Sequence, residues 1–312
     1  MQLSVIIPVK NEMSNIKAVY KSIFNSNYKN KEVYFVDAGS TDGTYEWLAK
    51  VTKNKTNYYL DINPKSSVSH GFNLIFPKTK GKYISRLDGH SIYPKGYFEK
   101  AIGILERNEA DVVGGPAHHE GKTWKGKAIA KCMMHPFGVG KTSFRTQREK
   151  KYVDTIPFPI YKRSVFEKVG LYDEELFRNQ DDELNYRCRE KGYRILMDPD
   201  LETIYYVREN LKDLWNQYFQ YGLYKPLVLK KVPSGRRLHH FAPPLFTISI
   251  PVLIFLGTIN WFFFLPIFAY FILLFLISIS IQDTIRKKLY SLFVFPCLHL
   301  GYGLGYIIGL IK

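Results

Sequence analysis

The sequence predicts an α/β protein in which a mainly parallel, Rossmann-like sheet is followed by an α-helical membrane region. Apolar runs of strand length alternate with helical patterns, and polar turns follow these runs. Beyond them, residues 241–281 and 289–311 contain no charged side chain. We therefore expect a folded domain over residues 1–225, and a basic membrane-proximal segment with about three transmembrane helices over residues 226–312.

The first two pairs of strand and helix carry the fold prediction. Leu3–Val9 is a continuous apolar run, typical of a strand that is covered on both faces. A helical pattern over 16–23, a second strand over Glu32–Asp37 and a helical pattern over 45–51 follow. This repeated order favours a doubly wound parallel sheet, whose ligands bind beyond the carboxyl ends of the strands.

The alternation of strands and helices continues with one interruption. We expect strands over 57–60, 82–88 and 111–115, and helices over 67–76, 97–108, from about 178, and 209–225. Residues 117–151 have weak periodicity and many Gly, Lys and His residues, so we expect a long connecting loop of the kind that often covers an active site. The last helix, rich in aromatic residues, suits either a membrane surface or ordinary packing between helices.

The stretch that ends in Asp88-Gly-His90 is the first candidate site. A carboxylate and an imidazole two residues apart, just past the end of a strand, can share one divalent cation. An ordinary Asp-Gly turn beside a histidine is the alternative. Asp37 stands at an equivalent strand end, so we expect it at the same edge of the sheet.

The charge distribution points to an anionic partner. The chain has 44 Lys and Arg residues against 28 Asp and Glu, a formal net charge of +16, and most of this excess precedes residue 241. No nucleic-acid-binding motif accompanies it, so we expect a membrane surface or a phosphorylated substrate and no nucleic acid. Three scattered cysteines form no zinc or disulfide spacing, which suits a reducing compartment.

The apolar tail predicts a multi-pass protein of the cell membrane. Two spans are expected near Pro243–Thr258 and Trp261–Ile281, and a third apolar segment over 289–311 either spans or lies at the interface, since it contains Pro296 and His299. Basic clusters over 225–237 and 286–288 flank the first two spans and place the large domain on the cytoplasmic face. Glycines at 301, 305 and 309 predict close packing on a neighbouring helix.

Five motifs stand in order along the chain: Val5-Ile-Ile-Pro-Val-Lys-Asn-Glu12, Val36-Asp-Ala-Gly-Ser-Thr-Asp-Gly-Thr44, Asn63-Pro-Lys65 with Asn73, Gly81-Lys-Tyr-Ile-Ser-Arg-Leu-Asp-Gly-His90 and Asn179-Gln-Asp-Asp-Glu-Leu-Asn185. Together they resemble family-2 glycosyltransferases, most closely the membrane-tethered branch that includes succinoglycan-type glucosyltransferases of bacterial exopolysaccharide synthesis. The resemblance covers about residues 1–225.

This resemblance implies a GT-A fold and a metal-dependent, inverting transfer from a nucleotide-activated sugar, usually a UDP-sugar. The site residues that it implies fall into four groups: Asp37 at the uracil or ribose with Pro8 and Glu12 beside the nucleoside, Asp88 and His90 at the metal, Asp181 as general base with Asp182 as second candidate, and Lys65 and Asn73 supporting the donor.

The sequence departs from the family pattern at three positions. His90 replaces a second aspartate, and because imidazole suits Mn²⁺ better than Mg²⁺, we expect a preference for manganese. Ala38 stands where many relatives have a second aspartate. Gln180 stands where many have glutamate, which removes a like charge that could raise the pKa of Asp181.

The membrane tail suggests an acceptor in the bilayer plane, and we expect a polyprenyl-diphosphate-linked saccharide. The alternatives are a polyprenyl-phosphate sugar transferase or a processive polysaccharide synthase on the same fold. Residues 217–221 resemble the Gln-x-x-Arg-Trp motif of processive synthases only loosely, which favours transfer of a single sugar. A catalytically inactive membrane scaffold is the alternative from another class.

Overall fold

A computed structural model describes residues 1–140 and 149–312, which form two compact units. Of these residues, the first unit contains 1–118 and 149–205, and the second contains 119–140 and 206–312. The boundary at residue 225 that we expect between two domains stays a prediction.

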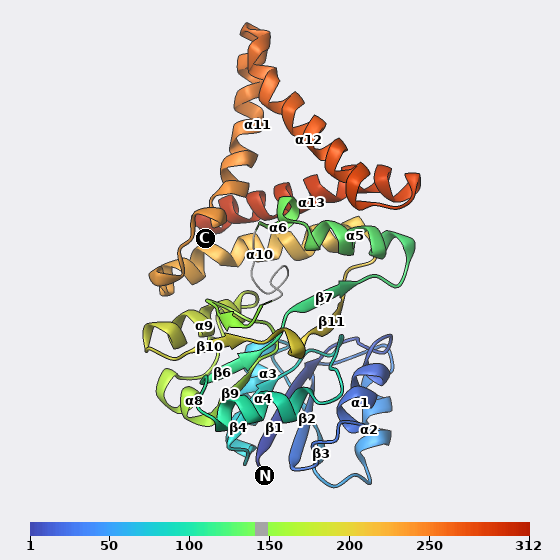
Figure 1. Ribbon diagram of the computed structural model, residues 1–312, viewed down its shortest axis with the longest axis vertical. Helices are drawn as coiled ribbons and strands as arrows, with labels where there is room; N and C mark the ends of the chain where they lie inside the picture. The colour runs from blue at the N-terminus through green and yellow to red at the C-terminus, as the bar shows by residue number, and fades with distance from the viewer. Residues whose placement is uncertain (141–148) are drawn as a thin grey trace. The chain divides into compact units, whose positions relative to one another are not determined.

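The first unit is built on an eight-stranded mixed sheet in the order β3-β2-β1-β4-β9-β6-β10-β8 (Figure 1). The first four of these strands run parallel, while β9 and β8 are antiparallel to their neighbours. The strands are β1 (Leu3–Val9), β2 (Lys31–Asp37), β3 (Tyr58–Ile62), β4 (Tyr83–Arg86), β6 (Val112–Gly114), β8 (Lys151–Tyr152), β9 (Ile160–Lys162) and β10 (Ile195–Met197).

Helices cover both faces of this sheet, which confirms the doubly wound architecture. Val5 and Ile7 of β1 pack in one core with Ile16, whereas Ile6 packs in a second core with Phe72. The unbroken apolar run of β1 therefore reflects burial on both faces. The helices of this unit are α1 (Ile16–Phe24), α2 (Thr44–Thr52), α3 (Val68–Ile75), α4 (Tyr97–Glu106), α8 (Arg163–Val169) and α9 (Gln180–Glu190).

The strand order creates a topological switch point beside β1. The chain passes from β1 to β2 and β3 on one side, and β4 returns to the other side. Val9 is paired with Asp37, and Ile6 is paired with Arg86. Side chains at and just beyond the ends of β2 and β4 therefore meet at one edge, where doubly wound sheets bind ligands.

A second, three-stranded sheet has the order β5-β11-β7. Strand β5 (Ser91–Ile92) follows His90 and pairs antiparallel with β11 (Thr203–Tyr206). The third strand, β7, covers Ala117–Glu120. Tyr205 of β11 places its ring edge-on to the His90 imidazole, with the centroids 5.2 Å apart, so this sheet supports the segment after β4.

The prediction of a long loop over 117–151 is wrong for most of its length. Besides β7, this stretch forms α5 (Trp124–Met134) and α6 (Pro136–Val139), while residues 141–148 lie outside the described part. Thr123 begins α5 by accepting a hydrogen bond from the backbone N–H of Gly126. The helical periodicity was hidden because small residues form much of the buried face: Gly126, Ala128, Ala130 and Cys132.

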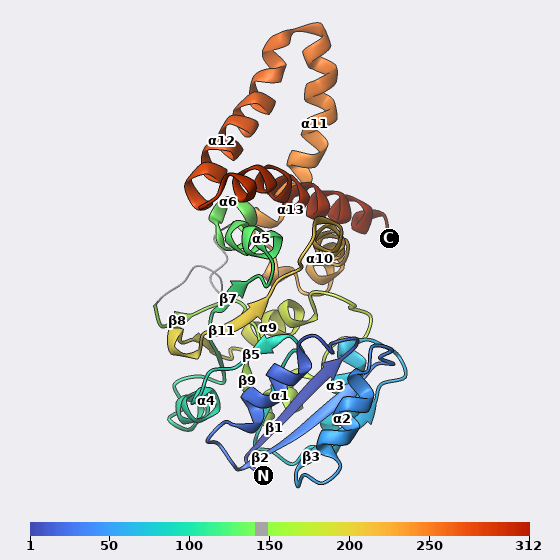
Figure 2. The same ribbon diagram turned by 90° about the vertical axis from the view of Figure 1, so that its right-hand side faces the viewer.

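The second unit is helical. Besides α5 and α6 it contains α10 (Leu211–Lys231), α11 (Ala242–Ile259), α12 (Leu265–Ile281) and α13 (Ile285–Ile311). Among the described residues, three segments are long and apolar enough to cross a membrane: Ala242–Ile259, Trp261–Ile281 and Ile285–Ile311. Figures 1 and 2 show α11 and α12 as a helical hairpin, with α10 and α13 lying side by side at its base.

The predicted close packing at the glycines of 301–309 is confirmed. A Cβ atom added at Gly305 would lie 2.1 Å from the carbonyl oxygen of Phe219, and one at Gly309 would lie 2.3 Å from that of Leu223. These glycines therefore allow the backbones of α13 and α10 to approach closely. The expected helix over 209–225 is thus a packing helix of this unit.

We predict opposite outcomes for two alanine substitutions on this stripe. Gly305→Ala places a methyl group against backbone and should destabilise the second unit by about 1–3 kcal/mol. Gly301→Ala is the matched control, because its Cβ atom would lie 3.4 Å from the nearest atom and alanine favours helix. The thermal unfolding midpoint of the detergent-solubilised protein measures both effects. A midpoint lowered equally by the two substitutions would contradict this packing.

Candidate active site

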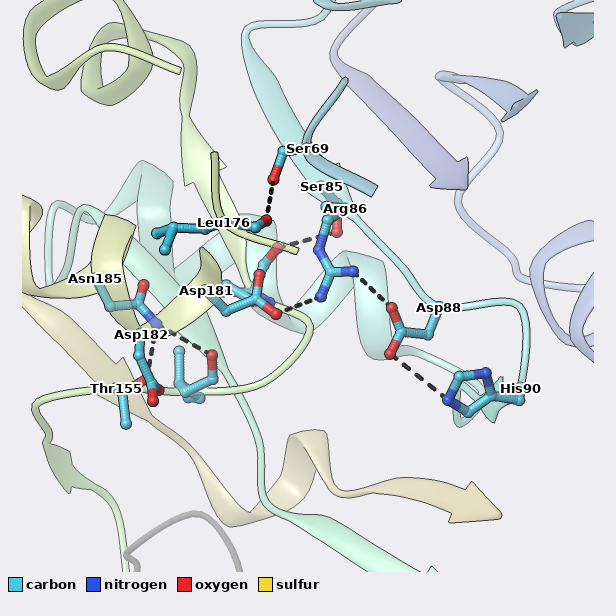
Figure 3. A network of polar contacts seen from close by, with 12 residues as sticks. Ser69, Ser85, Arg86, Asp88, His90, Thr155, Leu176, Asp181, Asp182 and Asn185 are labelled. Carbon is cyan, nitrogen blue, oxygen red and sulfur yellow. Dashed lines mark hydrogen bonds and ion pairs between the residues drawn. The ribbon is translucent and has the colours of Figure 1, made fainter. Parts of the chain in front are cut away.

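A buried arginine connects the two carboxylates at the centre of the site. Arg86 ends β4, and its side chain is only 3% exposed. One guanidinium nitrogen, Nη1, donates to Asp88 Oδ1 at 2.6 Å, and the other, Nη2, donates to Asp181 Oδ2 at 2.7 Å. Figure 3 shows the guanidinium lying between the two carboxylates. Arg86 thereby joins the end of β4 to the first turn of α9.

The two carboxylates have opposite pKa shifts. Burial opposes the ionisation of Asp88, but Arg86 and His90 outweigh it and hold the Asp88 pKa below its usual value. Burial raises the pKa of Asp181, and the charges of Asp88 and Asp182 add to this against the influence of Arg86. Gln180 removes one like charge from beside Asp181, but burial, Asp88 and Asp182 still raise the Asp181 pKa.

His90 is oriented by a second carboxylate. Its Nδ1 atom lies 2.9 Å from Glu12 Oε1, and its Nε2 atom lies 3.8 Å from Asp88 Oδ2. If Nδ1 donates its hydrogen to Glu12, the Nε2 lone pair faces Asp88. A carboxylate partner of this kind commonly holds metal-binding histidines in position.

These atoms fit a divalent cation in part. Asp88 Oδ2 and His90 Nε2 are a hard oxygen and an imidazole nitrogen facing each other, while Arg86 takes the other Asp88 oxygen. Within residues 1–140 and 149–312, no group of three or more His, Cys, Asp or Glu side chains could hold a metal. A cation here would thus need further ligands from a bound diphosphate or water.

Asp37 offers a buried, unpaired acceptor. It is 2% exposed, and its Oδ1 atom accepts hydrogen bonds of 2.9 Å from the backbone N–H groups of Gly39 and Ser40. Its Oδ2 atom is buried and makes no hydrogen bond to any described residue. Because buried polar atoms normally have partners, this oxygen suits a donor group of a ligand. Pro8, on the neighbouring strand, is paired with Val36.

The other three candidate residues contact neighbouring loops. The Lys65 Nζ atom lies 3.5 Å from Glu174 Oε2, and Asn73 Nδ2 donates to Glu174 Oε1 at 3.2 Å and to the Tyr172 carbonyl at 2.8 Å. Asp182 Oδ1 accepts from Thr155 Oγ1 at 2.9 Å, away from Arg86 (Figure 3). The structure thus brings Asp88, His90, Glu12 and Asp181 together, and leaves Lys65, Asn73 and Asp182 outside this cluster.

Arg86 is the residue that the sequence reasoning missed. It lies inside the motif that carries the resemblance, and a charged residue at the end of a buried strand was a signal of pairing. Its partner Asp181 lies 95 positions away, so spacing could not identify the pair.

The doubly wound fold of the first unit is that of GT-A glycosyltransferases. The model of the family described as "Glycosyl transferase family 2" matches residues 4–170, more than half of the chain. The chain belongs to glycosyltransferase family 2.

Two relatives extend the comparison. The chain is 32% identical over 222 residues to the succinoglycan biosynthesis protein ExoA of Rhizobium meliloti, covering 70% of this chain and 67% of that protein. It is 25% identical over 325 residues to a dolichyl N-acetyl-α-D-glucosaminyl phosphate 3-β-D-2,3-diacetamido-2,3-dideoxy-β-D-glucuronosyltransferase of Methanococcus voltae, covering 99% of this chain and 97% of that protein.

Solved structures support the fold. The mannosyltransferase PcManGT of Pyrobaculum calidifontis, in complex with GDP-Man and Mn²⁺, aligns with a TM-score of 0.66 at 14% identity, over 98% of this chain and 87% of that one. A fragment of S. aureus TarS, in complex with UDP-GlcNAc, aligns with a TM-score of 0.56 at 15% identity, over 98% of this chain and 91% of that one.

The opposite pKa shifts predict opposite effects of two substitutions on stability in the presence of a chelator. The lowered pKa of Asp88 means that its ionised form stabilises the fold above about pH 4, and this stabilisation is lost as the pH falls through the lowered pKa. The raised pKa of Asp181 means that its ionisation costs stability as the pH rises from about 4 through the raised pKa. At pH 7, Asp88→Asn should lower the unfolding midpoint, and Asp181→Asn should raise it.

Thermal unfolding from below pH 4 up to pH 8 measures both differences. The Asp181 difference should be absent below about pH 4, and the Asp88 difference should shrink as the pH falls from about 4 through the lowered pKa. Glu167→Gln, at an exposed position on α8, is the control for removing a negative charge. A lower midpoint for both site variants at pH 7 would show that the two carboxylates are not differentiated in this way.

Proposed function

We propose that this protein is an inverting glycosyltransferase that moves one sugar from a UDP-sugar to a lipid-linked saccharide in surface polysaccharide synthesis. The observation that carries this proposal is the buried Arg86 between Asp88 and Asp181 at the switch point of the sheet. Such a site holds one carboxylate beside a candidate cation position and a second carboxylate with a raised pKa.

Family membership and the two relatives support the class of reaction. The relatives' names describe succinoglycan biosynthesis in one case and a dolichyl-linked substrate in the other. We infer a polyprenyl-diphosphate-linked acceptor, whose anionic head would be attracted to the basic stretch over 225–237. We also infer that the catalytic unit faces the cytoplasm, because basic clusters precede α11 and follow α12.

Asp37, Pro8 and Glu12 are proposed to bind the nucleoside. The unpaired Oδ2 atom of Asp37 can accept a hydrogen bond from uracil N3–H or from a ribose hydroxyl. Glu12 additionally orients His90. Lys65 and Asn73 both contact Glu174, and we propose that they support the donor from this position.

Asp88 and His90 would hold the divalent cation, and the imidazole favours Mn²⁺ over Mg²⁺. When bound, the cation would neutralise the charge that grows on the departing diphosphate. Arg86 keeps Asp88 ionised for this role, as the lowered pKa of Asp88 indicates. Glu12 keeps the imidazole turned towards Asp88.

Asp181 is proposed as the general base. The bond between the sugar and the diphosphate breaks while the acceptor oxygen attacks the opposite face of the anomeric carbon, which inverts its configuration. The proton of the acceptor hydroxyl passes to an oxygen of Asp181. A raised pKa makes this carboxylate a better proton acceptor near neutral pH than an ordinary aspartate.

The proposal predicts different effects for two neighbouring carboxylates. Asp181→Asn should lower sugar transfer about 10²-fold to 10⁴-fold, because it removes the proton acceptor. Asp182→Asn is the matched control and should change transfer only slightly, since Asp182 bonds to Thr155 rather than Arg86. The measurement is incorporation of labelled sugar from a UDP-sugar into the lipid extract of membranes that contain each variant. Near-normal transfer by Asp181→Asn with loss in Asp182→Asn would assign the base to Asp182.

A further inference from the structure

Helix α13 carries a continuous apolar stripe on its exposed side. Ile285, Leu289, Phe293, Leu304 and Ile311 are between 39% and 85% exposed. Three half-buried apolar residues lie between these exposed ones and continue the spacing of three or four positions: Pro296, Leu300 and Ile307. Because steps of three and four residues return to one side of a helix, these side chains form a single apolar face over all 27 residues.

The opposite side of α13 is covered by a polar helix. The glycines of α13 lie against the backbone of α10, and Gly222 of α10 lies in turn against Tyr302. Helix α10 carries Lys212 and Asp213 in its first turn and Lys225 further along, and it does not qualify as a span. Because the two helices are packed together, each segment of α13 lies at the same depth in a membrane as the segment of α10 beside it.

The hairpin and α13 cannot both cross a membrane in the orientation that the second unit shows. Figures 1 and 2 both show α13 lying across the base of the α11–α12 hairpin, with α10 on the side away from the hairpin. A hydrogen bond between Tyr270 and His299 and the close contact of Gly303 with Thr247 connect the three helices. If the hairpin is perpendicular to the bilayer, α13 lies along its plane.

Length and charge favour the hairpin as the crossing element. Its two segments of 18 and 21 residues are about 27 and 31 Å long, close to the 30 Å of a hydrocarbon core. A crossing by α13 would instead carry the charged residues of α10 into the hydrocarbon, which is costly.

We propose that α13 is an interfacial helix whose apolar stripe lies in the acyl chains just below anionic headgroups, so that the chain crosses the membrane twice. Arg286 and Lys288 at its start flank this stripe and complement those headgroups. Arg286 also stacks 3.8 Å from the ring centroid of Trp124, a residue type that favours the interface. Lys312 then lies on the same side of the membrane as the catalytic unit, whatever the reaction is.

Single cysteines in the full chain test this topology in sealed membrane vesicles. Lys53→Cys marks the catalytic unit, Asn260→Cys marks the tip of the hairpin, and Lys312→Cys marks the carboxyl terminus; all three positions are exposed. A membrane-impermeant maleimide should label the first and third alike, and the second from the opposite side. The unsubstituted chain measures background from its three buried cysteines, and detergent gives full labelling. The proposal is overturned if the cysteine at 312 is labelled from the same side as the one at 260, or if all three cysteines are labelled from one side.

Spin labels along the stripe provide a second, independent readout. Nitroxides at Leu289, Phe293, Leu304 and Ile311, each introduced through cysteine, should show one shallow depth from the ratio of oxygen to nickel-complex accessibility. A helix that spans would give a depth that is greatest near the middle of the series and falls towards both ends. That profile would overturn the interfacial assignment even if every variant folds.

Discussion

The shared guanidinium of Arg86 is the interaction on which the proposed site depends. A buried arginine needs compensating charge, and here two carboxylates from segments 95 positions apart supply it. Arg86 ends β4, so its position depends on the sheet, while Asp181 depends on the start of α9. The contacts of Arg86 therefore set the distance between Asp88 and Asp181 and influence the ionisation of both carboxylates. These are the two groups proposed to act on the sugar donor.

One positive charge between two carboxylates leaves the cluster with an excess negative charge. A cation beside Asp88 or a proton on Asp181 can compensate this excess. The pKa shifts agree with this, because the lowered pKa of Asp88 favours its ionised form and the raised pKa of Asp181 favours its protonated form. The His90 imidazole, which contacts Glu12, places a nitrogen atom on the Asp88 side only.

The sequence was sufficient for the features that depend on local pattern. The apolar run of β1 predicted burial on both faces, and Asp37 and Asp88 were placed at one edge because each follows a strand. The sequence was insufficient for the features that depend on contacts between segments far apart in the chain. The pairing of Arg86 with Asp181 has no local signature, and α5 was taken for a loop because small residues form its buried face. The direction of α13 depends on α10, which hydropathy cannot show.

The most direct test of the proposed roles, a cation held by Asp88 and His90 and a general base at Asp181, is the binding of UDP to the detergent-purified protein. Titration calorimetry measures this binding in Mn²⁺ and in chelator. The account predicts Mn²⁺-dependent binding by the unaltered chain and by Asp181→Asn with similar dissociation constants, because the base does not hold the donor. His90→Gln should weaken binding in Mn²⁺ by roughly tenfold or more, since it removes a ligand of the cation. Equal binding with and without Mn²⁺ in all three proteins, or loss of binding in Asp181→Asn, would contradict the account.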